Sequence, residues 1–250
     1  MNNFIDIIVP VFNSEKYIED TLNSILQQDY DKYKVYIIDD CSIDNSFEII
    51  KKFSKKNFFC ERLTKNMGPA FCRNLGMRLS SAEYICFIDS DDLWTPDKLS
   101  TQLEFMLKED VNFSYTSYKT FKTNNKISKL INVPEFFNYE TFLKNTSIAT
   151  SSIMIRRDLI GHTKFKKIGY GFDDYIFKSD MLKKNTVAKG IQKYLTIYRL
   201  RKDSISSNLL RNLKWVWQIN KNYHKIKFYK NIYYILCIIY NSLIKYRFKI

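Results

Sequence analysis

The chain has 250 residues, 45% of them hydrophobic, and only 6 Gly and 4 Pro, which excludes a low-complexity or disordered chain and allows one large domain. Its net charge of +14 is concentrated near the carboxyl end, where residues 201–250 hold eleven Lys and Arg but one acidic residue, Asp203. The five cysteines include no CxxC pair, which excludes a disulfide framework and a zinc site with paired cysteines.

Short apolar runs alternate with amphipathic segments through the first hundred residues. Strands are predicted at residues 4–9, 34–39, 58–63 and 84–88, and helices at residues 14–28, 45–56, 69–79 and 95–108. Ser14 is the expected N-cap of the first helix, Pro69 suits the first turn of the third, and Thr95-Pro96 is expected to open the fourth. This alternation predicts a doubly wound, mainly parallel sheet with flanking helices.

The pattern changes after residue 110. Strands are predicted at residues 111–121, 151–155 and 192–200, a turn at Asn124-Asn125 and a helix at residues 173–184. These elements indicate a mixed sheet. We therefore expect one α/β domain over residues 1–205, followed by a helical tail over residues 206–250.

The tail mixes aromatic and cationic residues between residues 209 and 230, and continues as an apolar segment over residues 232–244. Rings and cations in alternation suit a bilayer interface, so one hypothesis is a helix or helix pair on an anionic membrane surface. The alternative is a helical lid packed on the domain. No apolar run reaches the roughly 18 to 20 residues of a membrane span. The first apolar run is short and carries Asp6, unlike a signal peptide, so a cytoplasmic location is expected.

Three carboxylates follow the strand predicted at residues 84–88. Asp89, Asp91 and Asp92 lie within four positions of one another. Like charges this close repel by several kcal/mol at about 4 Å and a protein-like dielectric. A hard divalent cation with oxygen ligands relieves that repulsion. Because the carboxyl ends of strands are where open α/β sheets bind ligands, this cluster predicts a metal-dependent site for a phosphate-bearing substrate.

A second acidic pair, Asp39-Asp40, ends another predicted strand and is expected at the same edge of the sheet. With Ser42 it could equally form a turn and a helix cap. Asp173-Asp174 opens the helix predicted at residues 173–184, where acidic residues also stabilise a helix amino terminus.

Four segments recur in a fixed order along the first half of the chain. They are Pro10-Val11-Phe12-Asn13, Asp39 to Ser46, Asn66 to Gly76, and Phe87 to Trp94 with Pro96. In this order and spacing they resemble family 2 of the inverting glycosyltransferases, of the bacterial surface-polysaccharide type, which have the nucleotide-sugar-binding GT-A fold. The likeness is close over roughly residues 4–110, and resumes at Gly171 to Asp174 and between Tyr198 and Ser206. It implies a nucleotide-binding half over residues 1–110 and an acceptor-binding half over residues 111–205.

The resemblance implies roles for individual residues. Asp40 is expected to accept from the imide N–H of uracil, with Phe12 against the base, and Asp89 to meet the ribose. Asp91, with Asp89, is expected to bind Mn²⁺ or Mg²⁺. Asp92 is expected to line the sugar pocket or support the metal, and Arg73 to lie near the donor phosphates or sugar. The implied nucleotide-sugar site comprises Pro10, Phe12, Asn13, Asp40, Arg73, Asp89, Ser90 and Asp92.

Asp174 is implied as the catalytic base, with Asp173 replacing the usual Glu of the family's acidic pair. Independently of the resemblance, sugar transfer with inversion needs a base for the acceptor hydroxyl and positive charge for the departing diphosphate. Simpler interpretations of two site residues remain: Arg73 as a surface helix residue and Phe12 as part of the core. His162 and His224 lack metal-ligand neighbours and are expected to be solvated or packed.

The predicted activity is therefore that of a hexosyl- or N-acetylhexosaminyl-transferase, which uses a nucleotide sugar and a glycan or lipid-linked glycan acceptor. The processive Gln-x-x-Arg-Trp motif is missing from the sequence, which favours single addition. A sugar-nucleotide nucleotidyltransferase is an alternative, but Pro10 to Ser14 lacks the glycine-rich basic loop that it needs. A nucleic-acid-binding protein is a third, but it leaves the acidic clusters unexplained, so no nucleic-acid partner is expected.

Overall fold

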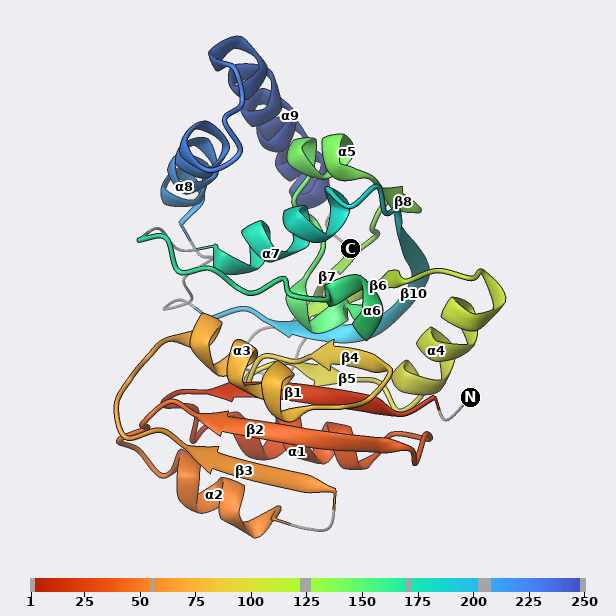
Figure 1. Cartoon of the computed structure of the whole chain (residues 1–250), viewed down its shortest axis with the longest axis vertical. Helices are drawn as coiled ribbons and strands as arrows, with labels where there is room; N and C mark the ends of the chain where they lie inside the picture. The colour runs from red at the N-terminus through yellow and green to blue at the C-terminus, as the bar shows by residue number, and fades with distance from the viewer. Residues whose placement is uncertain (1–2, 55–56, 122–126, 170–171, 202–207, 248–250) are drawn as a thin grey trace.

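The computed structural model describes residues 3–54, 57–121, 127–169, 172–201 and 208–247, with side chains as far as residue 243. The described strands form one mixed sheet in the order β3-β2-β1-β4-β9-β6-β10-β5, with β7 paired to β6 and β8 to β10. The amino-terminal half lies at the bottom of Figure 1 and the last two helices at the top.

The amino-terminal half is the parallel, doubly wound arrangement that the sequence predicts. Its strands are β1 (Ile5–Val11), β2 (Tyr33–Asp39), β3 (Phe58–Arg62) and β4 (Tyr84–Phe87), and its helices are α1 (Ile18–Leu26), α2 (Ser46–Lys52), α3 (Pro69–Leu79) and α4 (Lys98–Lys108). β1 pairs in parallel with both β2 and β4. Its side chains alternate between two cores: Ile5, Ile7 and Val9 face one, and Ile8 faces the other.

Helix α3 lies unusually close to the sheet because residue 76 is glycine. A Cβ at Gly76 would lie 2.5 Å from Ile8 Cγ2, too close for any other residue without movement. This close approach fixes the position of Arg73, one turn earlier on the same helix.

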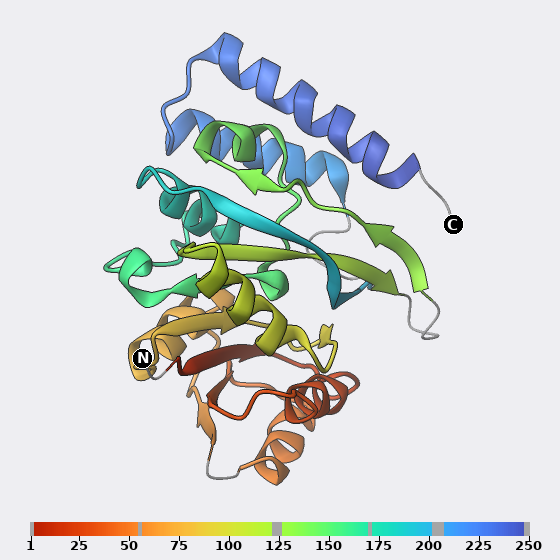
Figure 2. The same ribbon diagram turned by 90° about the vertical axis from the view of Figure 1, so that its right-hand side faces the viewer.

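The parallel pairing of the strands is interrupted at β9. The remaining strands are β5 (Leu93–Trp94), β6 (Phe113–Phe121), β7 (Ile127–Ile131), β8 (Phe136–Phe137), β9 (Met154–Arg156) and β10 (Ala188–Arg199). β9 is antiparallel to both β4 and β6, and β10 runs parallel to β6 (Figure 2). The other helices of this half are α5 (Tyr139–Lys144), the 3₁₀ turn η1 (Thr150–Ser152), α6 (Arg157–Ile160) and α7 (Asp173–Leu182).

Two predicted helix starts are wrong. α1 begins at Ile18, because the Ser14 hydroxyl bonds to Phe12 O and Ser90 Oγ instead of capping the helix. α4 begins at Lys98, because Thr95 N–H donates to Leu195 O as β5 pairs with β10. The predicted turn at Asn124-Asn125 lies outside the described residues.

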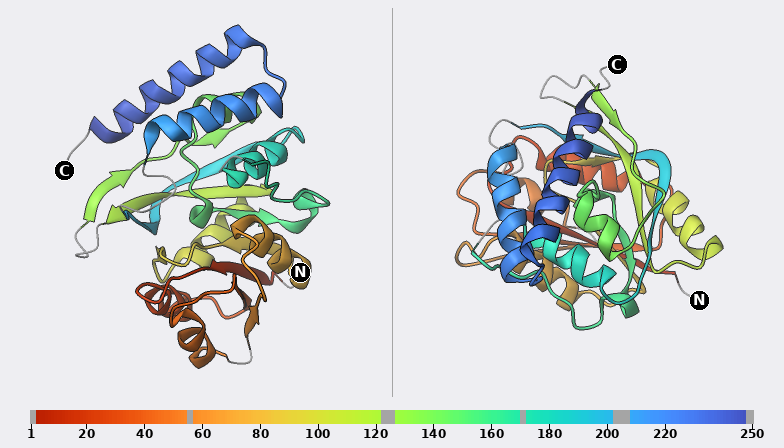
Figure 3. Two further views of the ribbon diagram at one scale, coloured as in Figure 1. Left: turned by 90° about the vertical axis from the view of Figure 1, so that its left-hand side faces the viewer. Right: turned by 90° about the horizontal axis from the view of Figure 1, so that it is seen from above.

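The tail folds as two helices, α8 (Leu209–Asn222) and α9 (Phe228–Arg247). They lie side by side over α5 and α7 (Figure 3). Val216, Ile219, Tyr234 and Ile238 are buried in the same core as α5 and α7, so the lid alternative describes the inner face of the tail. No helix in the described ranges is both long and apolar enough to cross a bilayer.

A buried polar chain holds the tail in place. Tyr175 OH on α7 donates to Asn220 Oδ1 at 2.9 Å, and Asn220 Nδ2 donates to Asn231 Oδ1 at 3.0 Å. Asn231 Nδ2 then donates to Trp217 O at 3.1 Å. Because such groups find partners in only one arrangement, these bonds fix α8 and α9 relative to α7.

Replacing Asn220 should loosen the tail. Asn220→Ala leaves the Tyr175 hydroxyl and the Asn231 side-chain oxygen without the partner they have in Asn220, and each unsatisfied buried group costs about 1 to 3 kcal/mol. Urea unfolding should show this loss of free energy, whereas Lys221→Ala, exposed on the same helix, should change it little. A loss for Asn220→Ala no larger than that of the control contradicts the role given to this chain.

Candidate active site

The predicted acidic segments meet at one edge of the sheet. Phe12 and Asn13 follow β1, Asp39 and Asp40 end β2, and the segment 89–92 follows β4. Since these strands are parallel, all three loops lie at their carboxyl ends, as expected. The Phe12 ring is 47% exposed, so its interpretation as part of the core is wrong, whereas Pro10 is buried within β1.

Hydrogen bonds join these loops into one rim. Ser14 Oγ lies 2.7 Å from Ser90 Oγ, which ties the β1 loop to the β4 loop. Asn13 takes the left-handed conformation (φ 47°); its N–H donates to Ser42 Oγ, and its Oδ1 accepts from Ile43 N. The position of Phe12 is therefore fixed by the hydrogen bonds of the two residues that follow it, Asn13 and Ser14.

Asp40 and Asp39 have different surroundings. Both oxygens of the buried Asp40 accept from backbone, from Met67 N at 2.6 Å and from Gly68 N at 2.8 Å. Asp40 therefore holds the loop that opens α3, where Gly68 has φ +90°. Asp39 Oδ2 accepts from Ser42 N, but its buried Oδ1 has no hydrogen-bond partner among the described residues. The unused acceptor at this point is therefore on Asp39, whereas the resemblance implies the contact with the base for Asp40.

The 89–92 cluster concentrates negative charge. Burial and the neighbouring Asp89 raise the pKa of Asp91 to about 6, although Arg201 lies 3.2 Å from its Oδ2. Asp92 is buried: its Oδ2 accepts from Ser151 Oγ at 2.5 Å and its Oδ1 from Arg199 N at 3.0 Å. Asp92 therefore ties the loop after β4 to η1 and β10, and its two expected roles, lining the sugar pocket or supporting the metal, stay predictions.

These carboxylates fit a metal that substrate ligands complete. In the parts of the chain that the structure describes, no three His, Cys, Asp or Glu side chains are grouped to hold a metal ion by themselves. Mg²⁺ characteristically binds one or two carboxylates together with substrate phosphates, and Asp89 and Asp91 supply that number. Burial, and after it the neighbouring Asp89, disfavours the charged form of Asp91, and a bound cation would favour it.

Arg73 connects the two halves of the molecule. Its guanidinium lies 2.6 Å from Asp89 Oδ1, in the loop after β4, and 3.5 Å from Asp173 Oδ2, at the start of α7. It also lies over the Phe165 ring, and the residue is only 7% exposed, so its interpretation as a surface helix residue is wrong. The pKa of Arg73 is raised because Asp89 and Asp173 outweigh the effect of its burial.

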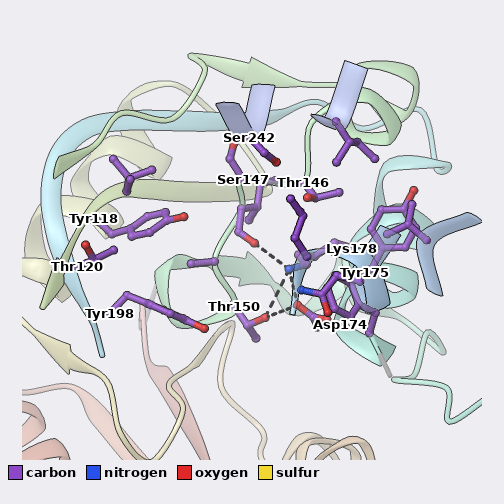
Figure 4. A pocket seen from close by; sticks show the side chains of 18 of the residues that line it. Tyr118, Thr120, Thr146, Ser147, Thr150, Asp174, Tyr175, Lys178, Tyr198 and Ser242 are labelled. Carbon is purple, nitrogen blue, oxygen red and sulfur yellow. Dashed lines mark hydrogen bonds and ion pairs between the residues drawn. The ribbon is translucent and has the colours of Figure 1, made fainter. Parts of the chain in front are cut away.

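Asp174 lies beside a buried lysine one turn along α7 (Figure 4). Its Oδ2 accepts from Lys178 Nζ at 2.7 Å and from Thr150 Oγ1 at 2.9 Å, and Lys178 also donates to Ile148 O. Burial alone would raise the pKa of Asp174, but Lys178 and the other partners lower it to about 2. By contrast, burial raises the pKa of Asp173, because Arg73 compensates only in part.

A cavity of about 500 Å³ opens beside these groups. Asp89 and Asp174 both line it, as do Lys178, Arg199 and Arg201. The acidic clusters at the end of β4 and at the start of α7 thus meet in one cleft, and Asp40 is joined to it through α3. Lys178 was missed from the sequence, although its spacing of four residues from Asp174 on a helix was a usable signal. Ser204 to Ser206 and Gly171 lie outside the described residues.

The sequence matches proteins that are known by name. The sequence model of the family described as "Glycosyl transferase family 2" matches residues 6–163. The chain is 34% identical over 229 residues to a putative teichuronic acid biosynthesis glycosyltransferase, TuaG, of Bacillus subtilis, covering 90% of each chain. It is 30% identical over 244 residues to WfgD of Escherichia coli, named UDP-Glc:alpha-D-GlcNAc-diphosphoundecaprenol beta-1,3-glucosyltransferase, covering 98% of this chain and 95% of that one.

Solved structures show the same fold. TarS residues 1–349 of S. aureus in complex with UDP superpose with a TM-score of 0.71 at 20% identity, over 98% of this chain and 73% of that one. A mannosyltransferase from Pyrobaculum calidifontis, solved with GDP-Man and Mn²⁺, gives 0.67 at 17% identity, over 89% and 64%. The predicted GT-A fold is confirmed.

Acid should remove a stabilising interaction of Asp174. Because its folded pKa of about 2 lies below the ordinary 3.8, ionised Asp174 stabilises the fold above about pH 4, and this is lost as the pH falls through 2. The difference in unfolding free energy between the wild type and Asp174→Asn should therefore shrink over that window in urea titrations. The exposed Asp158→Asn serves as the control, and a difference for Asp174→Asn that stays constant with pH contradicts the assignment.

Proposed function

The chain belongs to glycosyl transferase family 2 and is a glycosyltransferase, and we propose that it moves a sugar, with inversion, from a UDP-sugar to a lipid-linked glycan during surface polysaccharide synthesis. One observation carries the proposal: Arg73 joins Asp89, in the cluster after β4, to Asp173, beside the proposed base. The same cleft thus offers carboxylates for a metal diphosphate and a carboxylate for the acceptor hydroxyl.

The nucleotide lies along the rim formed by the β1, β2 and β4 loops. The exposed Phe12 ring offers a face to the base, and Asp39 Oδ1 or Asp40 accepts its imide N–H. Asp89 meets the ribose. Asp91, with Asp89, would hold Mn²⁺ or Mg²⁺, which would supply Lewis-acid stabilisation of the diphosphate charge.

Asp174 acts as the general base in this proposal. Its low pKa keeps it ionised at neutral pH, and its position on the cavity wall lets it accept the proton of an acceptor hydroxyl as the new C–O bond forms. The bond from the anomeric carbon to the diphosphate oxygen breaks in the same displacement, which inverts that carbon. Asp173, paired with Arg73, serves to orient the helix amino terminus, and remains the alternative base.

The acceptor is proposed from the relatives together with the cleft. The name of the E. coli relative specifies a glucosyl donor and a sugar on a diphosphate lipid. An acceptor of that class, receiving one hexosyl or N-acetylhexosaminyl unit, suits a protein that also presents an apolar and basic face. A sugar-nucleotide nucleotidyltransferase is disfavoured by the family match.

The outer face of α9 is proposed to contact an anionic membrane. Its outward side chains form an exposed apolar stripe made up of Tyr229, Ile232, Tyr233, Leu236, Tyr240 and Leu243. Exposed Lys221, Lys225, Lys227 and Lys230 lie at or next to the start of the helix. Rings at headgroup depth and cations against anionic lipid are the usual basis of such binding, and they support the proposed location at the cytoplasmic face of the cell membrane.

Two substitutions should separate donor binding from chemistry. Asp91→Asn removes a proposed metal ligand and should abolish the Mn²⁺-dependent thermal shift with UDP. Asp174→Asn should keep that shift and lose turnover by about 10²-fold or more, the range of general-base catalysis. Both are measured with UDP-sugars in a thermal-shift assay and a product assay.

The matched variant is Asp173→Asn. Turnover retained by Asp174→Asn but lost by Asp173→Asn assigns the base to Asp173. A Mn²⁺-dependent shift that survives Asp91→Asn removes Asp91 from the metal site. No shift with CDP-sugars is expected, because cytosine has no imide N–H.

The stripe on α9 should govern vesicle binding. Leu236→Glu with Tyr240→Glu places two acids on the outer face, and should reduce co-sedimentation with anionic vesicles by about tenfold or more. Leu107→Glu, exposed on α4, provides the control. Equal binding by the wild type, the stripe variant and the control rejects the membrane contact without affecting the assignment of the enzyme.

A further inference from the structure

The tail forms the roof of the cavity beside Asp174. From α8, Leu209, Asn212, Leu213 and Val216 line it, and from α9, Ile238 and Ser242. We infer that α8 and α9 are part of the acceptor site, and that the cavity takes a glycosyl diphosphate with its sugar at Asp174 and its apolar chain under the roof. This inference rests on the proposed function and extends it, since the acceptor site was expected within residues 111–205.

One part of the cavity matches a sugar. Thr146, Ser147 and Thr150 present hydroxyl groups on the side of Asp174 and Lys178 (Figure 4). Across the cavity, the Tyr118 and Tyr198 rings lie with their centroids 6.1 Å apart. Hydroxyl groups that can both donate and accept, together with aromatic surfaces, suit the polar edge and apolar face of a pyranose.

The roof and the helix beneath it match an apolar chain. Phe142 on α5, Leu213 and Val216 on α8 and Ile238 on α9 line the cavity with aliphatic and aromatic carbon and belong to one hydrophobic cluster. Burying a hydroxyl against such a surface without a hydrogen bond costs roughly 1 to 3 kcal/mol, so a second sugar is a poor occupant. A hydrocarbon gains about 0.8 kcal/mol for each methylene removed from water.

The volume also indicates a ligand. Protein interiors are close-packed and have few voids larger than a water molecule, whereas this cavity of about 500 Å³ lies within the roughly 300 to 1,000 Å³ of small-molecule sites. The Tyr175–Asn220–Asn231 hydrogen bonds hold its roof in one position. A fixed roof is what a site needs in order to discriminate between acceptors.

Filling the apolar part should weaken acceptor binding selectively. Leu213→Trp on α8 and Ile238→Trp on α9 each add a ring under the roof. The substrates are one glycosyl diphosphate bearing either an alkyl chain or a methyl group, assayed in solution without vesicles. The wild type should show the lower KM for the alkyl acceptor, and both variants should raise that KM by about tenfold, with little change for the methyl acceptor.

The control is Leu210→Trp, because Leu210 is 80% exposed on the same helix. Its KM values should match those of the wild type, and UDP binding should be unchanged in all three variants. The inference is overturned if the Trp variants retain the wild-type KM for the alkyl acceptor, or if the wild type has the same KM for both acceptors. Either result leaves the proposed function intact. The wild-type comparison stands even if a Trp variant fails to fold. No transfer by the wild type to either acceptor, from any of the nucleotide sugars, overturns the proposed function and this inference with it.

Discussion

Repulsion between carboxylates is the constraint around which this site is built. Aspartates from the loop after β4 and from the start of α7 are held together at a partly buried cleft, where like charges cost far more than in water. Cations balance them: Arg73 on α3 for Asp89 and Asp173, Arg201 for Asp91, and Lys178, one turn along the same helix, for Asp174. Burial and the neighbouring Asp89 still raise the pKa of Asp91, which a bound cation would lower.

The sequence predicted what depends on local periodicity. The strand and helix alternation of the first half and the meeting of its acidic loops follow from patterns within one element and from the geometry of parallel strands. The insertion of β9 between β4 and β6 could not be predicted in this way, because the pairing is decided between segments some seventy residues apart. For the same reason Ser14 was mistaken for a cap, since its true partner is Ser90.

The roles of the site residues show the same limit. An Asp-Asp pair after a strand predicts hydrogen-bond acceptors at that place. Only the structure shows that both carboxylate oxygens of Asp40 accept from the loop before α3, while one carboxylate oxygen of Asp39 has no partner among the described residues. In the tail, composition allowed a membrane surface or a packed lid. The inner face of the tail packs on the domain, as the lid alternative predicts. The outer face of α9 carries the exposed stripe, and its contact with a membrane stays a prediction.

Most of the hydrogen bonds that hold the tail come from residues outside the cavity wall. Of the three residues that hold the roof, Asn220 and Asn231 do not line the cavity and Tyr175 does, while Leu213, Val216 and Ile238 shape the space beneath the roof. Substitutions in the second set can therefore change that space and leave the hydrogen bonds that hold the tail in place. The same catalytic domain could in this way accept different glycans. The carboxyl-terminal helices are therefore the first segment to exchange when acceptor specificity is to be transferred between paralogues.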